Sequence, residues 1–391
     1  MVYQAYTTED FEGLSDSNQQ FFTNLANRIL FISESITEFE CVLACVGVVV
    51  NLFHMLVLTR NTMTMNSVNV MMIGIALCDL FNMSFNVYDT TMILIQKSDK
   101  CRPPLSYSTK LIEFWASAFE DHTRRLSSLY GVMMALTRYL IIKNALNSKF
   151  EIISKSLFAL GAMFITFVLS TILTLLFWSR YEVMEIKPWK PSAECPGFPL
   201  GYSVPQYKSS LDSVYLMEDS IYLQIFSVLD GLIKIIPTAM FPVLTFLLIK
   251  ELKKAESSRR KVSAVNQKEE SSKSDQATKV VVLMAVFYMA AEGPLGVLYV
   301  VQGFVTSPTG IMEMTVDLID IFGVFVSINA IMHCIICLTV SSQYQKTAKN
   351  VFCCVKCLAG RKTKPLPNAT KVSVSSAGRV RKSTMEQETS R

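Results

Sequence analysis

Charged residues are scarce in this sequence. Asp, Glu, Lys and Arg make up 18% of the 391 residues, whereas 51% are hydrophobic. Soluble domains usually have about 25% charged residues. The shortage of charge argues against the two or three soluble domains that the length alone would suggest. It favours a single integral membrane bundle.

Histidine is scarcer still, and its placement bears on enzymatic function. The chain has three histidines, His54, His122 and His333, and each lies in a different apolar segment. Catalytic and metal sites bring His together with Cys, Asp or another His. The spacing predicts no such cluster, so we expect no catalytic residues, no metal site of this kind and no enzyme.

The first 35 residues lack an apolar core and include Glu9, Asp10, Glu12 and Asp16. A cleavable signal peptide needs an apolar core of about 7–15 residues. We therefore expect residues 1–35 to be an extracellular tail, with the first apolar segment starting membrane insertion.

Seven apolar segments follow the tail. Each is long enough to cross about 30 Å of hydrocarbon as a helix. The predicted spans are residues 36–59, 67–95, 112–142, 155–178, 221–249, 280–303 and 313–340. The sequence thus predicts an all-α fold, a seven-transmembrane helix bundle over residues 36–340.

The positive charges of the loops predict the orientation of the bundle. The loops on one side, with the C-terminal tail, contain 24 Lys or Arg, and those on the other side contain nine. Basic loops stay in the cytoplasm. We therefore expect a multi-pass plasma-membrane protein with its N-terminus outside and its C-terminus inside. The net charge of +5 is then a topology signal, and we expect no nucleic-acid partner.

The chain beyond the last span is basic and contains a group of three cysteines. We expect a short amphipathic eighth helix at the membrane surface over residues 341–358, in contact with lipid, and a disordered cytoplasmic tail over 359–391. Palmitoylation and idle thiols are alternative readings of the cysteines Cys353, Cys354 and Cys357. A phosphorylated tail would bind arrestin, and an unmodified tail is the alternative.

Only two of the ten cysteines, Cys101 and Cys195, fall in the predicted outer loops. Two lone thiols that face an oxidising space are expected to pair. The resulting disulfide would tie the long loop over residues 179–220 to the start of the third span.

Ionisable side chains inside spans are expensive and indicate function. Most of them here fall in the outer halves of the spans, where they would converge on an outward-opening cavity. The candidate ligand-binding residues are Glu113, Glu120, Asp121, Arg124, Arg125, Asp230, Lys234, Glu292, Asp317 and Asp320. Several form oppositely charged pairs four residues apart, which neighbour each other on a helix. Such pairs either neutralise each other in a packed bundle or open when a charged ligand competes.

An ordered set of motifs accompanies these residues. It consists of "GVVVNLFHMLVLTR", "IGIALCDL", "MALTRYLI", "KIIPTAMFPVL", "AAEGPLG" and "NAIMHCIICLTVSSQYQ". The set resembles the rhodopsin-like G-protein-coupled receptors. It is closest to the class w serpentine receptors of nematodes, which resemble FMRFamide-type neuropeptide receptors. The resemblance covers about residues 36–355.

The resemblance implies roles for particular residues. Arg138, followed by Tyr139, matches the arginine that meets the G protein at the inner end of the third span. The family's polar core would correspond to Asn51, Asp79, Ser127 and Asn329. This core would hold an allosteric sodium ion, with Asn51 bracing Asp79, or would be a hydrogen-bonded cluster without an ion. Cys101 and Cys195 would match the family's outer disulfide.

Four positions depart from the general family. Thr137 replaces the acidic residue before the arginine, and Glu292 stands where a tryptophan is usual. Ala330 and His333 replace the Pro and Tyr of the seventh-span motif. These departures leave the switching mechanics open.

Two functions remain in view. The first is a receptor that binds an extracellular neuropeptide, of FMRFamide-like type, and activates a heterotrimeric G protein. The alternative is a chemosensory receptor for a small environmental molecule. We expect no resident cofactor in either case, apart from the sodium ion.

Overall fold

The computed structural model describes residues 5–145, 147–211, 221–262, 267–305 and 309–360. The chain divides into two units, Met1–Val351 and Phe352–Arg391. The helix bundle lies within the first unit.

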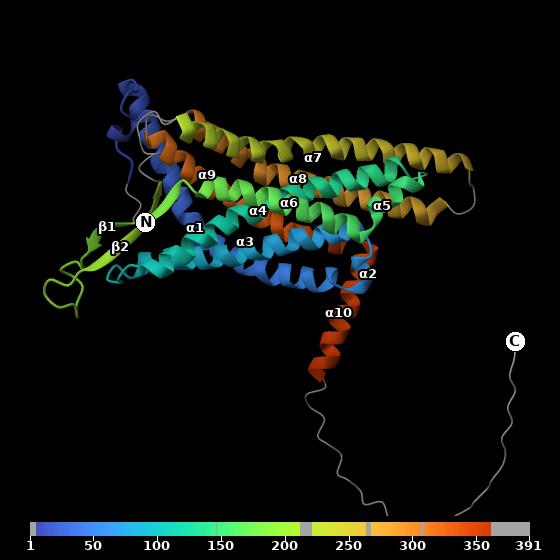
Figure 1. Ribbon diagram of the computed structural model, residues 1–391, viewed down its shortest axis with the longest axis horizontal. Coiled ribbons are helices and arrows are strands. Elements are labelled where there is room, and N and C mark those ends of the chain that lie inside the picture. The colour runs from blue at the N-terminus through green and yellow to red at the C-terminus, as the bar shows by residue number, and fades with distance from the viewer. Residues whose placement is uncertain (1–4, 146, 212–220, 263–266, 306–308, 361–391) are drawn as a thin grey trace, which may run out of the picture. The chain divides into compact units, whose positions relative to one another are not determined.

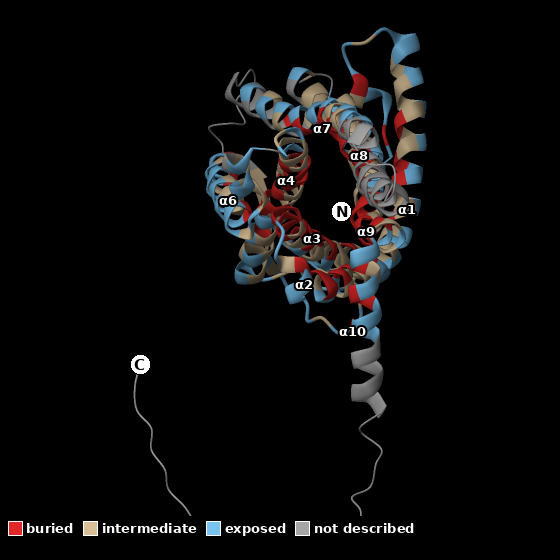
Figure 2. Ribbon diagram, turned by 90° about the vertical axis from the view of Figure 1, so that its right-hand side faces the viewer, coloured by how far each residue is buried: buried red, intermediate tan, exposed pale blue. Residues whose placement is uncertain are grey.

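Seven long helices make up the described part of the bundle and run side by side (Figure 1). They are α1 (Asp16–Leu58), α3 (Ser67–Ser98), α4 (Tyr107–Lys143), α6 (Ser156–Trp178), α7 (Ile221–Val262), α8 (Gln267–Phe304) and α9 (Thr309–Val340). Each predicted span lies within one of these helices to within one residue at either end. Seen end-on, buried residues gather on the faces that the helices turn toward one another (Figure 2).

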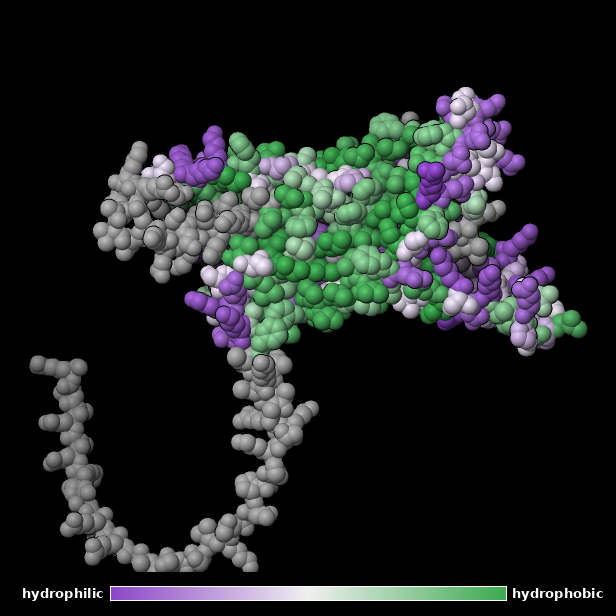
Figure 3. Space-filling model, turned by 180° about the vertical axis from the view of Figure 1, so that it is seen from behind, coloured by the Kyte–Doolittle hydropathy of each residue, from purple (hydrophilic) through white to green (hydrophobic). Residues whose placement is uncertain are grey.

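Six of these helices are long and apolar enough to cross a membrane, and α4 is not among them. The composition of α4 explains the exception, because charged residues occupy its outer half and Arg138 its inner half. A helix of this kind is stable in a bilayer only if its neighbours cover its polar faces. In contrast, α6 exposes large apolar side chains such as Leu157, Phe164 and Ile165. Figure 3 shows a hydrophobic middle between two hydrophilic ends.

Short elements lie at the two ends of the bundle (Figure 1). The inner end, as assigned by the loop charges, has α2 (Asn61–Thr64), η2 (Ser148–Phe150), α5 (Glu151–Ser154) and the start of α10 (Ser342–Gly360). Tyr344 of α10 is fully buried, and its hydroxyl lies 2.7 Å from Nδ1 of His54 in α1. This contact fastens the first turn of α10 to the bundle, where the sequence predicts an eighth helix.

The outer end has a β-hairpin that the sequence did not predict. Strands β1 (Tyr181–Trp189) and β2 (Val204–Leu211) pair in antiparallel register, with Val183 opposite Ser209. The all-α fold class holds for the bundle, and this hairpin lies in the long outer loop over residues 179–220. A disulfide joins Cys101 to Cys195 and ties the loop between the strands to the chain just before α4.

The N-terminal segment departs from the expected extracellular tail. Helix α1 begins at Asp16, twenty residues before the predicted span. The chain before it contains the 3-10 helix η1 (Thr8–Phe11) and folds back against α1 and α9. Phe11 is fully buried there. The amide of Asn27 accepts from the backbone N–H of Tyr6 at 2.9 Å and donates to its carbonyl at 3.0 Å.

This packing predicts different effects for two glycines of α9. A Cβ at Gly310 would lie 2.7 Å from the carbonyl oxygen of Asp10 and 2.8 Å from the Phe11 ring, whereas a Cβ at Gly323 would meet only Glu40 at 3.6 Å. We expect Gly310→Ala to loosen residues 5–15 by about 1–3 kcal/mol. Amide hydrogen exchange in this segment should then rise about tenfold or more. The control, Gly323→Ala, should leave exchange unchanged, and equal exchange in both variants would contradict the packing.

Candidate functional site: a polar cavity inside the bundle

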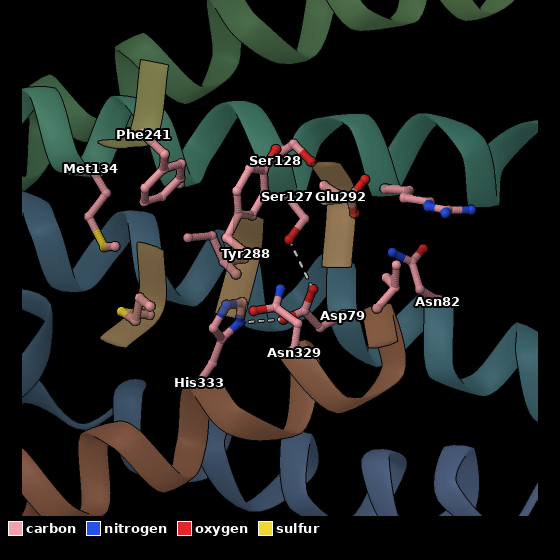
Figure 4. A pocket seen from close by; sticks show the side chains of 15 residues that line it. Asp79, Asn82, Ser127, Ser128, Met134, Phe241, Tyr288, Glu292, Asn329 and His333 are labelled. Atoms are coloured by element: carbon pink, nitrogen blue, oxygen red, sulfur yellow. Dashed lines mark hydrogen bonds and ion pairs between the residues drawn. The ribbon is translucent and has the colours of Figure 1, made fainter. Parts of the chain in front are cut away.

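Asp79 of α3 is the centre of a hydrogen-bonded group at mid-bundle. The Ser127 hydroxyl of α4 donates to its Oδ1 at 2.9 Å, and Nδ1 of His333 in α9 lies 2.9 Å from its Oδ2. Because a carboxylate oxygen accepts, Nδ1 of His333 carries the hydrogen. Figure 4 shows both contacts converging on Asp79. Three helices are therefore joined through one buried carboxylate.

A cavity of about 30 Å³ opens beside this group. Water-sized cavities need about 10–15 Å³, so the space holds one or two waters. The lining comes from α3 (Ile75, Asp79, Asn82), α4 (Arg124, Ser127, Ser128, Gly131, Met134), α7 (Phe241), α8 (Met284, Tyr288, Glu292) and α9 (Val326, Asn329, His333). Five of the seven helices thus meet at one polar cavity.

Two members of the predicted polar core have different surroundings. Asn329 lines the cavity, and its Oδ1 is buried without a hydrogen-bond partner. Asn51 is fully buried but donates to the carbonyl of Gly47 in its own helix at 3.1 Å. Among the described contacts none joins Asn51 to Asp79. The bracing role that the resemblance implied for Asn51 is therefore replaced by the contact of His333.

The surroundings of Asp79 bear on the sodium ion that the resemblance implied for this core. A hard cation takes about six oxygen ligands. Here an N–H of His333 points at one carboxylate oxygen and the Ser127 hydroxyl donates to the other, so each oxygen of Asp79 already accepts one hydrogen bond. Among the described side chains of the predicted core, Oδ1 of Asn51 and Oδ1 of Asn329 are buried without a hydrogen-bond partner. His333 instead serves as the counter-group of Asp79.

This arrangement predicts that sodium does not stabilise the receptor. The melting temperature of the purified wild-type chain should be the same in NaCl and in KCl of equal strength. His333→Ala should create a sodium response, because Asp79 then lacks its counter-group. The control, Asp79→Asn combined with His333→Ala, should again show none. A sodium-dependent melting temperature in the wild type would contradict this account.

Arg124 and Glu292 line the same cavity without hydrogen-bonding to each other. Nε and Nη2 of Arg124 are buried without a partner. Glu292 is 5% exposed, and its carboxylate takes part in no hydrogen bond or ion pair within the described residues. Glu292 is the first of the acidic groups whose charge acts on Arg124, ahead of Glu120 and Asp121. Two opposite charges therefore line one small cavity and attract each other without a direct hydrogen bond.

The neighbouring Arg125 has a different environment. Its Nη2 donates to Oδ2 of Asp121 at 2.7 Å, and its Nη1 donates to Thr174 Oγ1 in α6 at 2.8 Å. Its guanidinium lies 5.4 Å from the centre of the Phe177 ring. Successive helix residues differ in direction by about 100°, which explains why Arg124 and Arg125 face different neighbours. Arg125 is directed at α6 and Asp121 pairs with it, and neither lines the cavity described above; their predicted role in ligand binding stays a prediction.

His122 belongs to the same α4–α6 contact. Its Nδ1 lies 3.1 Å from Ser170 Oγ and 3.3 Å from Thr174 Oγ1. The polar side chains of α6 are thus used to cover one polar face of α4.

The outer acidic residues are mostly engaged as well. The Tyr6 hydroxyl donates to Oδ2 of Asp317 at 2.7 Å. Burial, together with the charge of Asp317, raises the pKa of the Tyr6 phenol, so the phenol remains a donor at neutral pH. Glu113 pairs with Lys110, one turn before it in α4. Asp320 is exposed.

Other predicted residues lie outside the described side chains. Asp230 and Lys234 are on the described backbone of α7, and Cys353, Cys354 and Cys357 are on that of α10. Their predicted roles in ligand binding and palmitoylation stay predictions.

The inner end of α4 places the predicted coupling residues together. Arg138 is half-buried, and its charge acts on Cys337 of α9. The ring of Tyr139 lies 5.3 Å from Nζ of Lys143. The hydroxyl of Thr137 points to the sulfur of Met71 at 3.9 Å. Thr137 therefore packs against α3 at the position where an acidic residue would hold the arginine.

The two ion pairs of α4 predict unequal stability effects. Asp121→Asn leaves the charge of Arg125 buried, since its side chain is 2% exposed. Removing one partner of a buried pair costs about 3–5 kcal/mol, and the partial exposure of Asp121 favours the lower end. Glu113→Gln, beside the 28% exposed Lys110, should cost under about 1 kcal/mol. Thermal unfolding of the purified variants checks this, and equal losses would contradict it.

The bundle, its polar core at Asp79, the arginine at the inner end of α4 and the disulfide-tied outer loop together define a seven-helix membrane receptor. The family model described as "Serpentine type 7TM GPCR chemoreceptor Srw" matches residues 38–355, and the chain belongs to this family, class w of the serpentine receptors. A search of curated proteins gives no match to the chain.

Membership sets the general function. The protein is a G-protein-coupled receptor and not an enzyme, it crosses the plasma membrane several times, and it has a ligand and a G protein as partners. The match does not support the FMRFamide resemblance.

Two residues with structural importance were missed by the sequence reasoning. From the sequence, His333 stands out only as a departure from the family motif. A histidine and an aspartate that both lie at mid-membrane, on different helices, nevertheless indicate a hydrogen-bonded pair. Tyr6 had no signal, because nothing in residues 1–35 predicted that the segment folds back on α9.

Proposed function

We propose that this receptor is chemosensory and binds a small molecule in the cavity between α3, α4, α7, α8 and α9. One observation carries the proposal: Arg124 and Glu292 line this cavity, and within the described residues neither Nε and Nη2 of Arg124 nor the Glu292 carboxylate has a hydrogen-bond partner. Ionisable groups buried in a membrane protein without compensation are functional by default. The family's chemoreceptor description supports the same reading.

A peptide ligand is less well supported. A basic side chain of a peptide would pair with one of three candidate acids, Glu113, Asp317 or Asp320. Glu113 is bound to Lys110 and Asp317 to Tyr6 of the receptor's own N-terminal segment. Asp320 is exposed, but a peptide that used Glu113 or Asp317 would have to displace the contact of that residue, whereas a small molecule in the cavity would displace neither.

Helix α4 is the proposed connection between ligand and G protein. Arg124 lies 14 residues before Arg138, about 21 Å along the helix axis at 1.5 Å per residue. A ligand that binds one arrangement of the bundle more tightly shifts the population toward it. Arg138 and Tyr139, at the inner end, would then present a different surface to the G protein. Arrestin binding to a phosphorylated tail would end the signal.

Arg138→Ala tests this coupling. Cells that express the receptor would be exposed to a panel of small water-soluble and volatile compounds, with G-protein activation as the readout. We expect the wild type to respond to at least one compound and Arg138→Ala to lose the response tenfold or more, while the ligand still stabilises the purified variant. The control, Arg60→Ala, removes an exposed cation at the inner end and should respond normally. An undiminished response in Arg138→Ala would contradict the proposal.

A further inference from the structure

We propose that Arg124 and Glu292 bind a small zwitterion, a molecule in which a carboxylate and an ammonium group are separated by a few atoms. The inference deepens the function proposed above and rests on the same cavity. It assigns the carboxylate of the ligand to Arg124 and its ammonium group to Glu292.

The state of the two side chains carries the argument. Nε and Nη2 of Arg124 are buried without acceptors, and Glu292 is 5% exposed with no donor on its carboxylate in the described part of the chain. Burying a charge without hydrogen bonds costs several kcal/mol, about the penalty of an unpaired ion in a protein. A molecule that supplies one acceptor group and one donor group removes both penalties at once.

The chemistry of each side chain decides which end of the ligand it takes. The planar guanidinium of arginine matches a carboxylate with two parallel hydrogen bonds. Glu292 offers acceptors only, so it takes the N–H groups of an ammonium ion. A ligand with the carboxylate alone would be repelled by Glu292, and one with the amine alone would be repelled by Arg124.

The other acidic group of the cavity does not compete for the ammonium. Both oxygens of Asp79 already accept hydrogen bonds, from Ser127 and from His333. Asp79 lies below Glu292 in the view of Figure 4 and is already hydrogen-bonded on both oxygens. The net charge offered to the ligand by that pair is zero, which fits a zwitterion better than an ion.

The cavity also limits the size of the ligand. At about 30 Å³ it holds one or two waters, and its walls include Met134 and Phe241. A zwitterion of a few heavy atoms enters only if a neighbouring helix shifts. Pro294 lies two residues after Glu292 in α8, and a proline inside a helix removes one backbone hydrogen bond. The segment that carries Glu292 therefore moves at lower cost than an unbroken helix would.

Thermal stabilisation of the purified full-length receptor tests the inference without requiring signalling. The probes are glycine, β-alanine and γ-aminobutyrate, whose charges lie progressively farther apart. Methylamine, propylamine, acetate and propionate are the single-charge controls. We expect at least one zwitterion to raise the melting temperature in the millimolar range, with no rise from the single-charge compounds.

Variants separate binding from folding. Arg124→Gln and Glu292→Gln should each weaken stabilisation by the zwitterion at least tenfold. Glu113→Gln, whose carboxylate does not line the cavity, should bind as the wild type does. Exchange of the charges, Arg124→Glu with Glu292→Arg, should restore part of the binding and so exclude simple misfolding of the single variants.

The outcomes for this inference and for the proposed function differ. Two outcomes overturn the inference. In the first, single-charge compounds stabilise the receptor as much as zwitterions do. In the second, no zwitterion stabilises it. If no zwitterion binds but an uncharged compound activates the G protein, the inference is wrong and the chemosensory function stands. If a zwitterion binds and depends on Arg124 and Glu292 without activating a G protein, the inference stands and the proposed function fails.

Discussion

The cost of placing charge in a low-dielectric bundle is the constraint on which the rest of this structure depends. Ionisable groups inside the membrane are usually paired with another group or take part in function. Asp79 is hydrogen-bonded by Ser127 and His333, and Arg125 is paired with Asp121 and contacts α6. Arg124 and Glu292 have no such compensation among the described contacts. We assign the hydrogen-bonded charges to the structure of the bundle. We assign the two charges without hydrogen bonds, Arg124 and Glu292, to ligand binding.

Helix α4 shows how one sequence serves both purposes. Its composition alone falls short of a membrane-spanning helix. One face, with Asp121, His122 and Arg125, is covered by polar and aromatic side chains of α6. The adjacent face, with Arg124 and Ser127, borders the cavity. Arg124 and Arg125 are adjacent in the sequence, but Arg125 contacts α6 whereas Arg124 borders the cavity.

Much of the fold could be predicted from the sequence, because hydrophobic segments and loop charges follow directly from the solvent properties of a bilayer. The ordered motifs led to the right family.

What could not be predicted depends on tertiary contacts. The i, i+4 spacing of Asp121 and Arg125 was visible, but the direction of that face was not. The contact of Tyr6 with Asp317 joins positions 311 residues apart, and no local pattern indicates it. The same holds for the β-hairpin, because it depends on the pairing of two separate strands.

The central claim is that Arg124 and Glu292 are kept for ligand binding at the expense of stability. Replacing an uncompensated buried pair by apolar residues of similar size is often neutral or stabilising, by about 1–4 kcal/mol. The most direct measurement is therefore the melting temperature of the ligand-free receptor with Arg124→Met and Glu292→Met together. The account predicts a melting temperature equal to or above that of the wild type. A clear decrease would show that the two charges support the folded bundle and would contradict the claim.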